Sequence, residues 1–321
     1  MLTKTDDRLV YAQPVCAAHT LRTREIGPQP LYFLSLPPSL ENRSARRRVH
    51  LRLTDRHYRL LDLLLLARAL ESTQLRIGAG FPLGPNSYAS YQRVLTKMDR
   101  ARLIDHLPRQ TPCEPIVYRL SRHSFAGLKI LNARWGRAVV ARYLTAIGSL
   151  PHLRGTNELL VRVLRSCDEL GWTLANWLRA EDLATYLELE RLIPDAYFHI
   201  QRTADGETRN AHFFLELQRA NRSVKVLQSK LMRYGELYYS GRYTQLFGTR
   251  ALRLLFVYTS DTESPVHRRI EQGVREAEKL GVTIARFGGL EAIKALPPTG
   301  CLLEPIWQAP SRGDPVALFD V

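Results

Sequence analysis

The chain has 321 residues, of which 45% are apolar and 24% charged. This composition is typical of a folded globular protein and excludes disordered, collagen-like and disulfide-dense classes. The longest apolar stretch, near residues 60–70, is interrupted by Asp62 and Arg68 and is shorter than the ~20 residues that span a bilayer. Two early acidic residues, Asp6 and Asp7, are unlike a signal peptide. We therefore expect a cytoplasmic protein without a membrane partner.

The formal charge of +15 is concentrated in one region. Residues 41–140 contain 19 basic and 7 acidic side chains, whereas residues 141–321 contain 23 and 21. A localised positive region attracts polyanions and accelerates their encounter with the protein. We expect a nucleic-acid partner; charge alone permits RNA as well as duplex or single-stranded DNA. A solvated basic face without a ligand is the alternative.

Several common site types are disfavoured by the motifs. The four cysteines lie too far apart for a zinc pair or a disulfide framework and are expected to be buried thiols. The nine histidines include no His-x-His pair, which removes the usual metal ligands of rolling-circle nickases. No GxxxxGK[ST] loop is present to bind ATP phosphates.

Residues 1–50 are predicted to form an extended basic arm. This segment contains five of the eighteen prolines and ends in an arginine run, Arg46, Arg47 and Arg48. Such an arm can lie along DNA phosphates or in a minor groove. Alternatively, it is a solubilising leader that packs on the body of the protein.

Residues 51–148 are predicted to form a winged helix-turn-helix domain. A helix opens after the N-cap candidate Thr54, a second follows residues 71–73, and a third covers about 86–102. Two short alternating strands, 103–107 and 116–120, then form a hairpin. In a winged helix the third helix enters the major groove. The residues expected to face DNA there are Ser87, Ser90, Arg93, Lys97 and Arg100. A winged helix used for protein contact is the alternative.

Residues 149–295 are predicted to form an α/β domain. Its first helix is expected to begin at Thr156, which places Glu158 in the first turn, near the positive end of the helix. The order that follows is strand, turn, strand, helix, strand, helix and strand. The last segment, 296–321, is expected to be an extended tail whose end packs on the body or on a partner.

One hairpin in this domain gathers groups that suit a metal ion. Pro194-Asp195 precedes a β-rich run, and Glu216 and Gln218 lie on one face of the following strand because side chains alternate along a strand. Pairing of the strands brings Asp195 beside them. Two carboxylates with a backbone carbonyl suit Mg²⁺ or Mn²⁺ better than zinc. A turn aspartate and an edge-strand charge are the structural alternatives.

This arrangement resembles the PD-(D/E)XK nucleases, whose fold is restriction-endonuclease-like. The resemblance implies that Asp195 and Glu216 hold the metal and that Gln218 occupies the position of the usual catalytic lysine. Lys225 or Lys230 from the next helix would then substitute for that lysine. Because Lys230 and Tyr234 are one helical turn apart, they share a face, and Tyr234 is expected to contact phosphate. The resemblance also implies a metal-binding role for Glu158, for which helix-end charge compensation is the alternative.

The whole layout, with PDA followed by FFLELQRANRSVKVLQSKLMRY and then two strand–helix units, resembles the replication-relaxation family of plasmids and mobile elements. That family usually has ELDRGT where this chain has ELQRAN at 216–221. Some similar proteins are relaxases, which nick one DNA strand.

The leading hypothesis is a mobile-element protein that binds DNA through the winged helix and nicks it with a metal-dependent site. Asp195, Glu216, Gln218 and Lys230 are the expected catalytic residues. The alternative is a non-catalytic DNA-binding, regulatory or docking protein built on a degenerate nuclease fold, which Gln218 favours. An RNA-binding factor is a third hypothesis. A homodimer or a complex with other DNA-processing proteins is compatible with each.

Overall fold

The computed structural model describes residues 51–319, apart from 83, 110, 136–148, 188–189, 191, 205–206, 220–221 and 260–262. The predicted basic arm, with Arg46, Arg47 and Arg48, lies outside the described residues.

The N-terminal part has the predicted order of helix, helix, helix and hairpin, with one short extra strand. Its elements are α1 (Asp55–Ala67), β1 (Leu70–Glu71), α2 (Ser72–Gly78), α3 (Pro85–Arg100), β2 (Ile104–His106), β3 (Val117–Leu120) and α4 (Ala126–Trp135). The three strands form an antiparallel sheet in the order β1-β3-β2.

Local sequence signals explain where these helices begin and which face they bury. Thr54 is the N-cap of α1 and forms a capping box with His57. In α3, Pro85 occupies the first turn, where the missing N–H costs nothing. Tyr91 and Met98 are fully buried, and the Tyr91 hydroxyl donates to the Ser72 carbonyl at 2.8 Å. The opposite face of α3 is consequently left to solvent.

The second part is built on a five-stranded mixed sheet. Its elements are α5 (Leu150–Leu170), β4 (Thr173–Arg179), α6 (Ala180–Leu187), β5 (Ala196–Ala204), β6 (Glu207–Arg219), α7 (Val224–Tyr239), α8 (Arg242–Phe247), β7 (Arg253–Thr259), α9 (Glu263–Lys279), β8 (Ala285–Gly289), α10 (Leu290–Ala295) and α11 (Gly300–Leu303). In the strand order β4-β5-β6-β7-β8, the first three strands pair antiparallel and the last three parallel. The predicted mixture of α-helices and β-strands is confirmed, with a mainly helical part before the five-stranded sheet.

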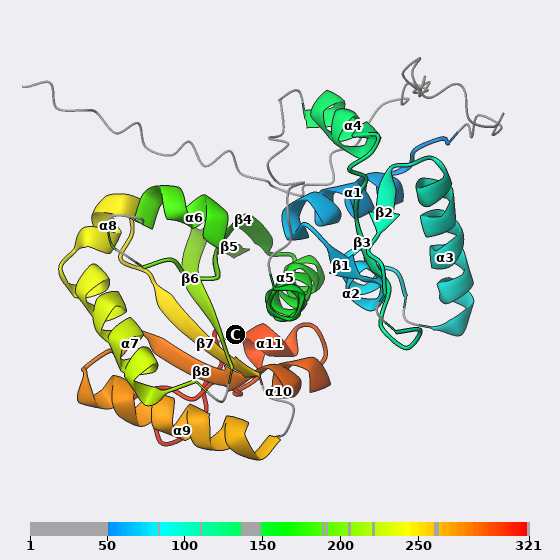
Figure 1. Cartoon of the computed structure of the whole chain (residues 1–321). Helices are drawn as coiled ribbons and strands as arrows, with labels where there is room; N and C mark the ends of the chain where they lie inside the picture. Colours follow the sequence, from blue (N-terminus) through cyan, green and yellow to red (C-terminus); the bar gives the residue numbers. More distant parts are fainter. Residues whose placement is uncertain are drawn as a thin grey trace, which may run out of the picture.

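Helices cover both faces of this sheet (Figure 1). Alternate residues of the central strands bury to opposite sides: Leu215 and Leu255 join a cluster with residues of α5, α10 and α11, whereas Phe214 and Phe256 join a cluster with residues of α7 and α9. The first cluster also contains the core of α1 to α3. Because α5 lies between the sheet and the N-terminal helices, the two parts share one continuous core (Figure 1).

The start of α5 differs from the prediction. The helix begins at Leu150, six residues before Thr156, and Pro151 is accommodated in its first turn. Glu158 is therefore in the middle of the helix and does not compensate its end. Gly155 marks the contact with β6, since a Cβ at this position would lie 2.5 Å from Leu217 Cδ2.

The C-terminal segment also differs from an extended tail. It contains α11 and forms backbone bridges from Phe287 to Gln308 and from Trp307 to Val316. Trp307 is fully buried, and Leu318 is 2% exposed. The segment packs on the body of the protein, one of the two arrangements expected. No helix in the described part of the chain is long and apolar enough to cross a membrane.

Candidate functional site

The register of the β5–β6 hairpin brings Asp195 to Glu216. Ala196 is paired with Leu215, so Asp195, one residue before β5, lies opposite Glu216. The Asp195 N–H donates to the Leu215 carbonyl at 3.0 Å, and the Leu217 N–H donates to Asp195 Oδ2 at 2.7 Å. These two bonds hold the Asp195 carboxylate at the carboxyl end of β6.

Glu216 is fully buried and accepts hydrogen bonds from three side chains. Tyr234 donates to Oε1 at 2.6 Å, Gln218 donates to Oε2 at 3.1 Å, and the Lys230 ammonium forms an ion pair with Oε2. Burial raises the pKa of Glu216, an effect that the Lys230 charge opposes. Glu216 is thus a desolvated carboxylate held by one cation and two neutral donors.

Helix α7 supplies the cation and one of the donors. Lys230 and Tyr234 are four residues apart, so they share the helix face that covers Glu216. Lys225, the other lysine considered, is exposed in the first turn of α7. Lys230 is therefore the lysine that reaches the acids.

The role expected for Tyr234 is corrected by its burial. Its side chain is fully buried, and its hydroxyl is used by Glu216, so it is not available to a DNA phosphate. Burial and the neighbouring Glu216 charge raise the pKa of Tyr234 well above its usual value. The hydroxyl stays protonated and fixes Glu216 in place, which also argues against a tyrosine nucleophile.

His152 belongs to the cluster and was missed by sequence reasoning. Its Nε2 lies 2.9 Å from Asp195 Oδ1, and this hydrogen bond raises the pKa of His152 against the opposing effect of burial. The residue lies in the first turn of α5, ahead of Thr156, where the helix was expected to begin. Correct placement of the helix start, signalled by Pro151, is what would have found it.

Glu158 lies elsewhere. It accepts hydrogen bonds from Arg162 Nε at 2.8 Å and from Gln74 Nε2 at 3.2 Å. Arg162 in turn donates to the carbonyls of Lys294 and Leu296, at the end of α10. Glu158 thus joins α2, α5 and α10. Its expected metal-binding role is corrected, because its carboxylate is part of a buried network between helices.

The acid pair suits a hard divalent cation only with outside ligands. Within the described residues, no group of three or more His, Cys, Asp or Glu side chains is arranged to hold a metal ion. Mg²⁺, however, is usually bound by one or two carboxylates, with water and substrate phosphate completing its octahedron. The Asp195 side chain is 20% exposed, so its oxygens can be reached from solvent. The residues present fit a cation held by Asp195 and Glu216.

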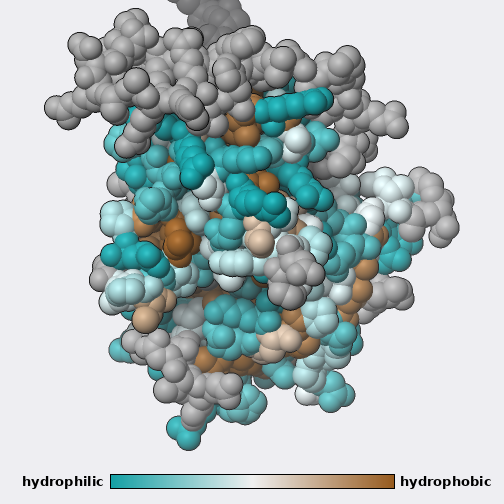
Figure 2. Space-filling model, turned by 90° about the vertical axis from the view of Figure 1, so that its right-hand side faces the viewer, coloured by the Kyte–Doolittle hydropathy of each residue, from teal (hydrophilic) through white to brown (hydrophobic). Residues whose placement is uncertain are grey.

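The basic side chains of α3 lie on its solvent face. Arg93, Lys97 and Arg100 are all exposed, whereas Ser90 is half-buried. Ser87 stabilises the loop before the helix. Its hydroxyl accepts a hydrogen bond from Arg76 Nη2 at 2.8 Å and donates to the Gly84 carbonyl at 3.0 Å. The side of the molecule that carries α3 is largely hydrophilic (Figure 2).

Comparison with known proteins identifies one family. The sequence model of the replication-relaxation family matches residues 63–250, more than half of the chain. No curated protein matches the chain significantly. A solved structure of the restriction endonuclease FokI bound to DNA is weakly similar, with 10% identity and a TM-score of 0.23. The similarity covers 75% of this chain and 44% of the FokI chain, so this chain spans less than half of that structure. On the match over residues 63–250, the chain belongs to the replication-relaxation family.

Proposed function

We propose that this protein is a DNA-nicking enzyme of mobile genetic elements, of the relaxase type, with the acid cluster as its active site. Family membership supports DNA processing in general. The observation that carries the finer proposal is the contact between Lys230 and Glu216, because it supplies a lysine to the acid pair although Gln218 occupies the usual lysine position.

In this proposal Asp195 and Glu216 hold Mg²⁺ or Mn²⁺. When bound, the ion stabilises negative charge on the phosphate and lowers the pKa of a coordinated water. Lys230 Nζ lies at Glu216 Oε2 and donates to the attacking water, which orients it. Attack by that water forms a new P–O bond as the bond to the deoxyribose oxygen breaks; the water loses a proton to solvent, and the departing oxygen takes one up from solvent. His152 Nε2 and the Leu217 N–H keep Asp195 in position, and Tyr234 does the same for Glu216.

DNA binding is assigned to the N-terminal part acting as a winged helix. The exposed residues Arg93, Lys97 and Arg100 occupy one side of α3 and form a surface that suits the phosphate backbone or base edges in the major groove. Nicking requires one copy of the protein at the DNA, whereas cutting both strands of a palindromic site would require a dimer.

A non-catalytic DNA-docking protein is the second candidate. One observation favours it: both Glu216 oxygens already have protein donors. A cation therefore has to compete with Tyr234 for Oε1 and with Lys230 and Gln218 for Oε2. In this alternative the cluster is a buried network that stabilises the sheet.

The two candidates are separated by a nicking assay on supercoiled plasmid and single-stranded oligonucleotides with Mg²⁺, Mn²⁺ or EDTA. Asp195→Asn removes the charge of the half-buried acid of the pair with little change in shape. The matched control is Asp168→Asn, which changes an aspartate that pairs with Arg59 on the surface of α5. DNA binding is measured in parallel by fluorescence anisotropy.

The enzyme proposal predicts metal-dependent nicking that D168N retains and D195N loses, with equal DNA binding by both variants. If the parent protein binds DNA but cleaves no substrate with either metal, the docking alternative replaces it. Competition between duplex DNA and structured RNA at equal salt separates both from an RNA-binding factor.

A further inference from the structure

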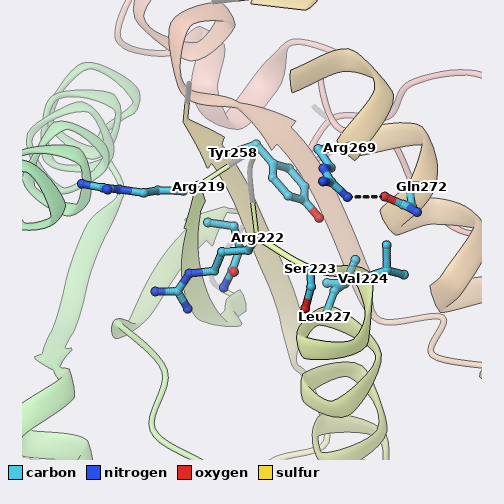
Figure 3. A pocket seen from close by; sticks show the side chains of 9 residues that line it. Arg219, Arg222, Ser223, Val224, Leu227, Tyr258, Arg269 and Gln272 are labelled. Atoms are coloured by element: carbon cyan, nitrogen blue, oxygen red, sulfur yellow. Dashed lines mark hydrogen bonds between the residues drawn. The ribbon is translucent and has the colours of Figure 1, made fainter. Parts of the chain in front are cut away.

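A small pocket lies beside the acid cluster, at the carboxyl ends of β6 and β7 (Figure 3). These strands run parallel, and Gln218 of β6 is paired with Tyr258 of β7. Gln218 lines the pocket and also donates to Glu216, so the pocket and the cluster are contiguous. Carboxyl ends of parallel strands are common positions for ligands, because the following helices begin there.

One buried polar group in the pocket has no partner. Tyr258 is 4% exposed, and its hydroxyl forms no hydrogen bond. The hydroxyl points into the space between α9 and the start of α7 (Figure 3). A buried hydroxyl without a partner is costly, so it favours a ligand that accepts its hydrogen bond.

The first turn of α7 faces the same space. Ser223 is the N-cap of this 16-residue helix, and its side chain makes no capping hydrogen bond. The first N–H groups of a helix have no intrahelical acceptor, and the helix dipole is positive at this end. Both features favour an anion with several oxygen atoms.

Arginines provide the charge. The Arg269 guanidinium is held by a 2.6 Å hydrogen bond to Gln272 Oε1, close to the Tyr258 hydroxyl (Figure 3). Arg219 and Arg222 line the other side of the pocket, and their exposed side chains point away from Tyr258 (Figure 3). Among the described residues that line the pocket, none is acidic. The lining thus places one guanidinium, that of Arg269, beside the neutral Tyr258 hydroxyl.

We propose that this pocket binds a phosphate group of a DNA strand, through the Tyr258 hydroxyl, the Arg269 guanidinium and the first turn of α7. The inference deepens the proposed function by giving the strand an anchor next to the Glu216–Lys230 pair. A phosphate held beside Gln218 places the adjoining part of the same strand at the acid cluster. The pocket therefore sets the position of the strand relative to Asp195 and Glu216, and it binds DNA whether or not cleavage occurs.

The test is the affinity of the full chain for a short fluorescent single-stranded oligonucleotide, measured by anisotropy in EDTA. Without a metal, failure of the nicking proposal does not affect the result. Arg269→Gln removes the charge and Tyr258→Phe removes the hydroxyl. Arg275→Gln is the matched control, because Arg275 is an exposed arginine six residues further along α9 and outside the pocket.

R269Q and Y258F are each expected to weaken binding about tenfold, the size of one hydrogen bond to a charged group. R269Q should also lower the slope of log K against log salt by about 0.7, the value for one phosphate contact on a single strand. R275Q should change neither quantity. Y258F should be at least as stable as the parent, since its hydroxyl has no protein partner.

Parent-like affinity in both R269Q and Y258F would overturn the proposal. An equal loss in R275Q would also overturn it, because the effect would then be general surface charge. Inorganic phosphate, compared with chloride at equal ionic strength, distinguishes the source of the anion. Displacement of the oligonucleotide by phosphate from the parent but not from R269Q would assign the pocket to free phosphate instead of a strand.

Discussion

Replacing Lys230 with methionine should destabilise the protein in a manner that depends on pH. The Lys230 side chain is 26% exposed and that of Glu216 is 1% exposed, so methionine fills most of the lysine volume but leaves the carboxylate without a cation. Breaking a buried ion pair by removal of one partner typically costs about 3–5 kcal/mol. Tyr234 and Gln218 still donate to Glu216, which places the expected cost at the low end of this range.

The destabilisation in K230M cannot exceed the free energy of protonating Glu216, because a protonated Glu216 carries no unpaired charge. From the reference pKa of 4.5, protonating a carboxyl group at pH 7 costs about 3 kcal/mol, since each pH unit corresponds to about 1.4 kcal/mol. At pH 5 this protonation free energy falls below about 1 kcal/mol. The pKa of Glu216, already raised by burial, rises further in K230M, so the variant loses stability as pH increases above 4.5. We expect a deficit of about 2–3 kcal/mol at pH 7 that largely disappears at pH 5.

Urea denaturation at both pH values, followed by tryptophan fluorescence, measures this deficit. Trp177 and Trp307 are both buried in the sheet domain and report on its unfolding. The double variant E216Q/K230M is the control, because replacing both partners removes the unpaired charge and should recover most of the stability. An equal deficit at pH 5 and pH 7, or a double variant no more stable than K230M, would refute this description of the pair.

Three further predictions concern the histidine, the contact between α5 and β6, and the basic face of α3. His152 has a raised pKa, so its contribution to stability is present below pH 6.5 and is lost as pH rises through the higher folded value. Between pH 6 and pH 8 the parent should therefore lose up to about 1 kcal/mol of unfolding free energy that H152Q does not lose, as measured in denaturation experiments. The figure is small because the His152 side chain is 41% exposed. Gly155→Ala places a Cβ 2.5 Å from a β6 leucine and should cost about 1–3 kcal/mol in urea denaturation, whereas Gly313→Ala, with nothing within 4 Å, should be neutral. Arg93→Gln with Lys97→Gln should lower the salt slope of duplex binding by about 2 in anisotropy titrations, and an unchanged slope would contradict a role for α3 at the phosphates.

The order of elements was predictable because local signals agree with the final packing. Thr54 before a leucine face, and alternation in 116–120, each predict an element that the structure contains. The start of α5 near residue 150 was not predictable, because glycine and proline between two patterned segments are typical of a linker. Here Pro151 occupies a first helical turn and Gly155 permits close contact with β6. Tertiary contact therefore decided what the local pattern left ambiguous.

The acid cluster was predictable where neighbours in sequence become neighbours in space. Period-two alternation and one hairpin suffice to bring Asp195, Glu216 and Gln218 together, and helical spacing adds Lys230. His152 comes from a helix whose start was placed too late, so its contact depends on tertiary packing.

Dependence on tertiary packing also explains why the contacts of the other residues discussed could not be predicted from the sequence. A carboxylate in a helix gives no sign of its buried partners, so the contacts of Glu158 with Arg162 and Gln74 were not foreseeable. The pocket at Tyr258 and Arg269 unites separate elements, β7 and α9, and only the assembled sheet shows it.

The most direct test of the proposed active site is single-turnover cleavage of a labelled DNA substrate in Mn²⁺ by the parent and by E216Q. Binding of the same substrate is measured on the same samples. We expect that the parent cleaves, that EDTA stops the reaction, and that E216Q binds DNA normally while its cleavage rate falls at least a hundredfold, roughly the loss from removing one charge-stabilising group. Equal cleavage by the two proteins would place the chemistry elsewhere, and binding without cleavage by the parent would make the cluster a structural network in a DNA-docking protein.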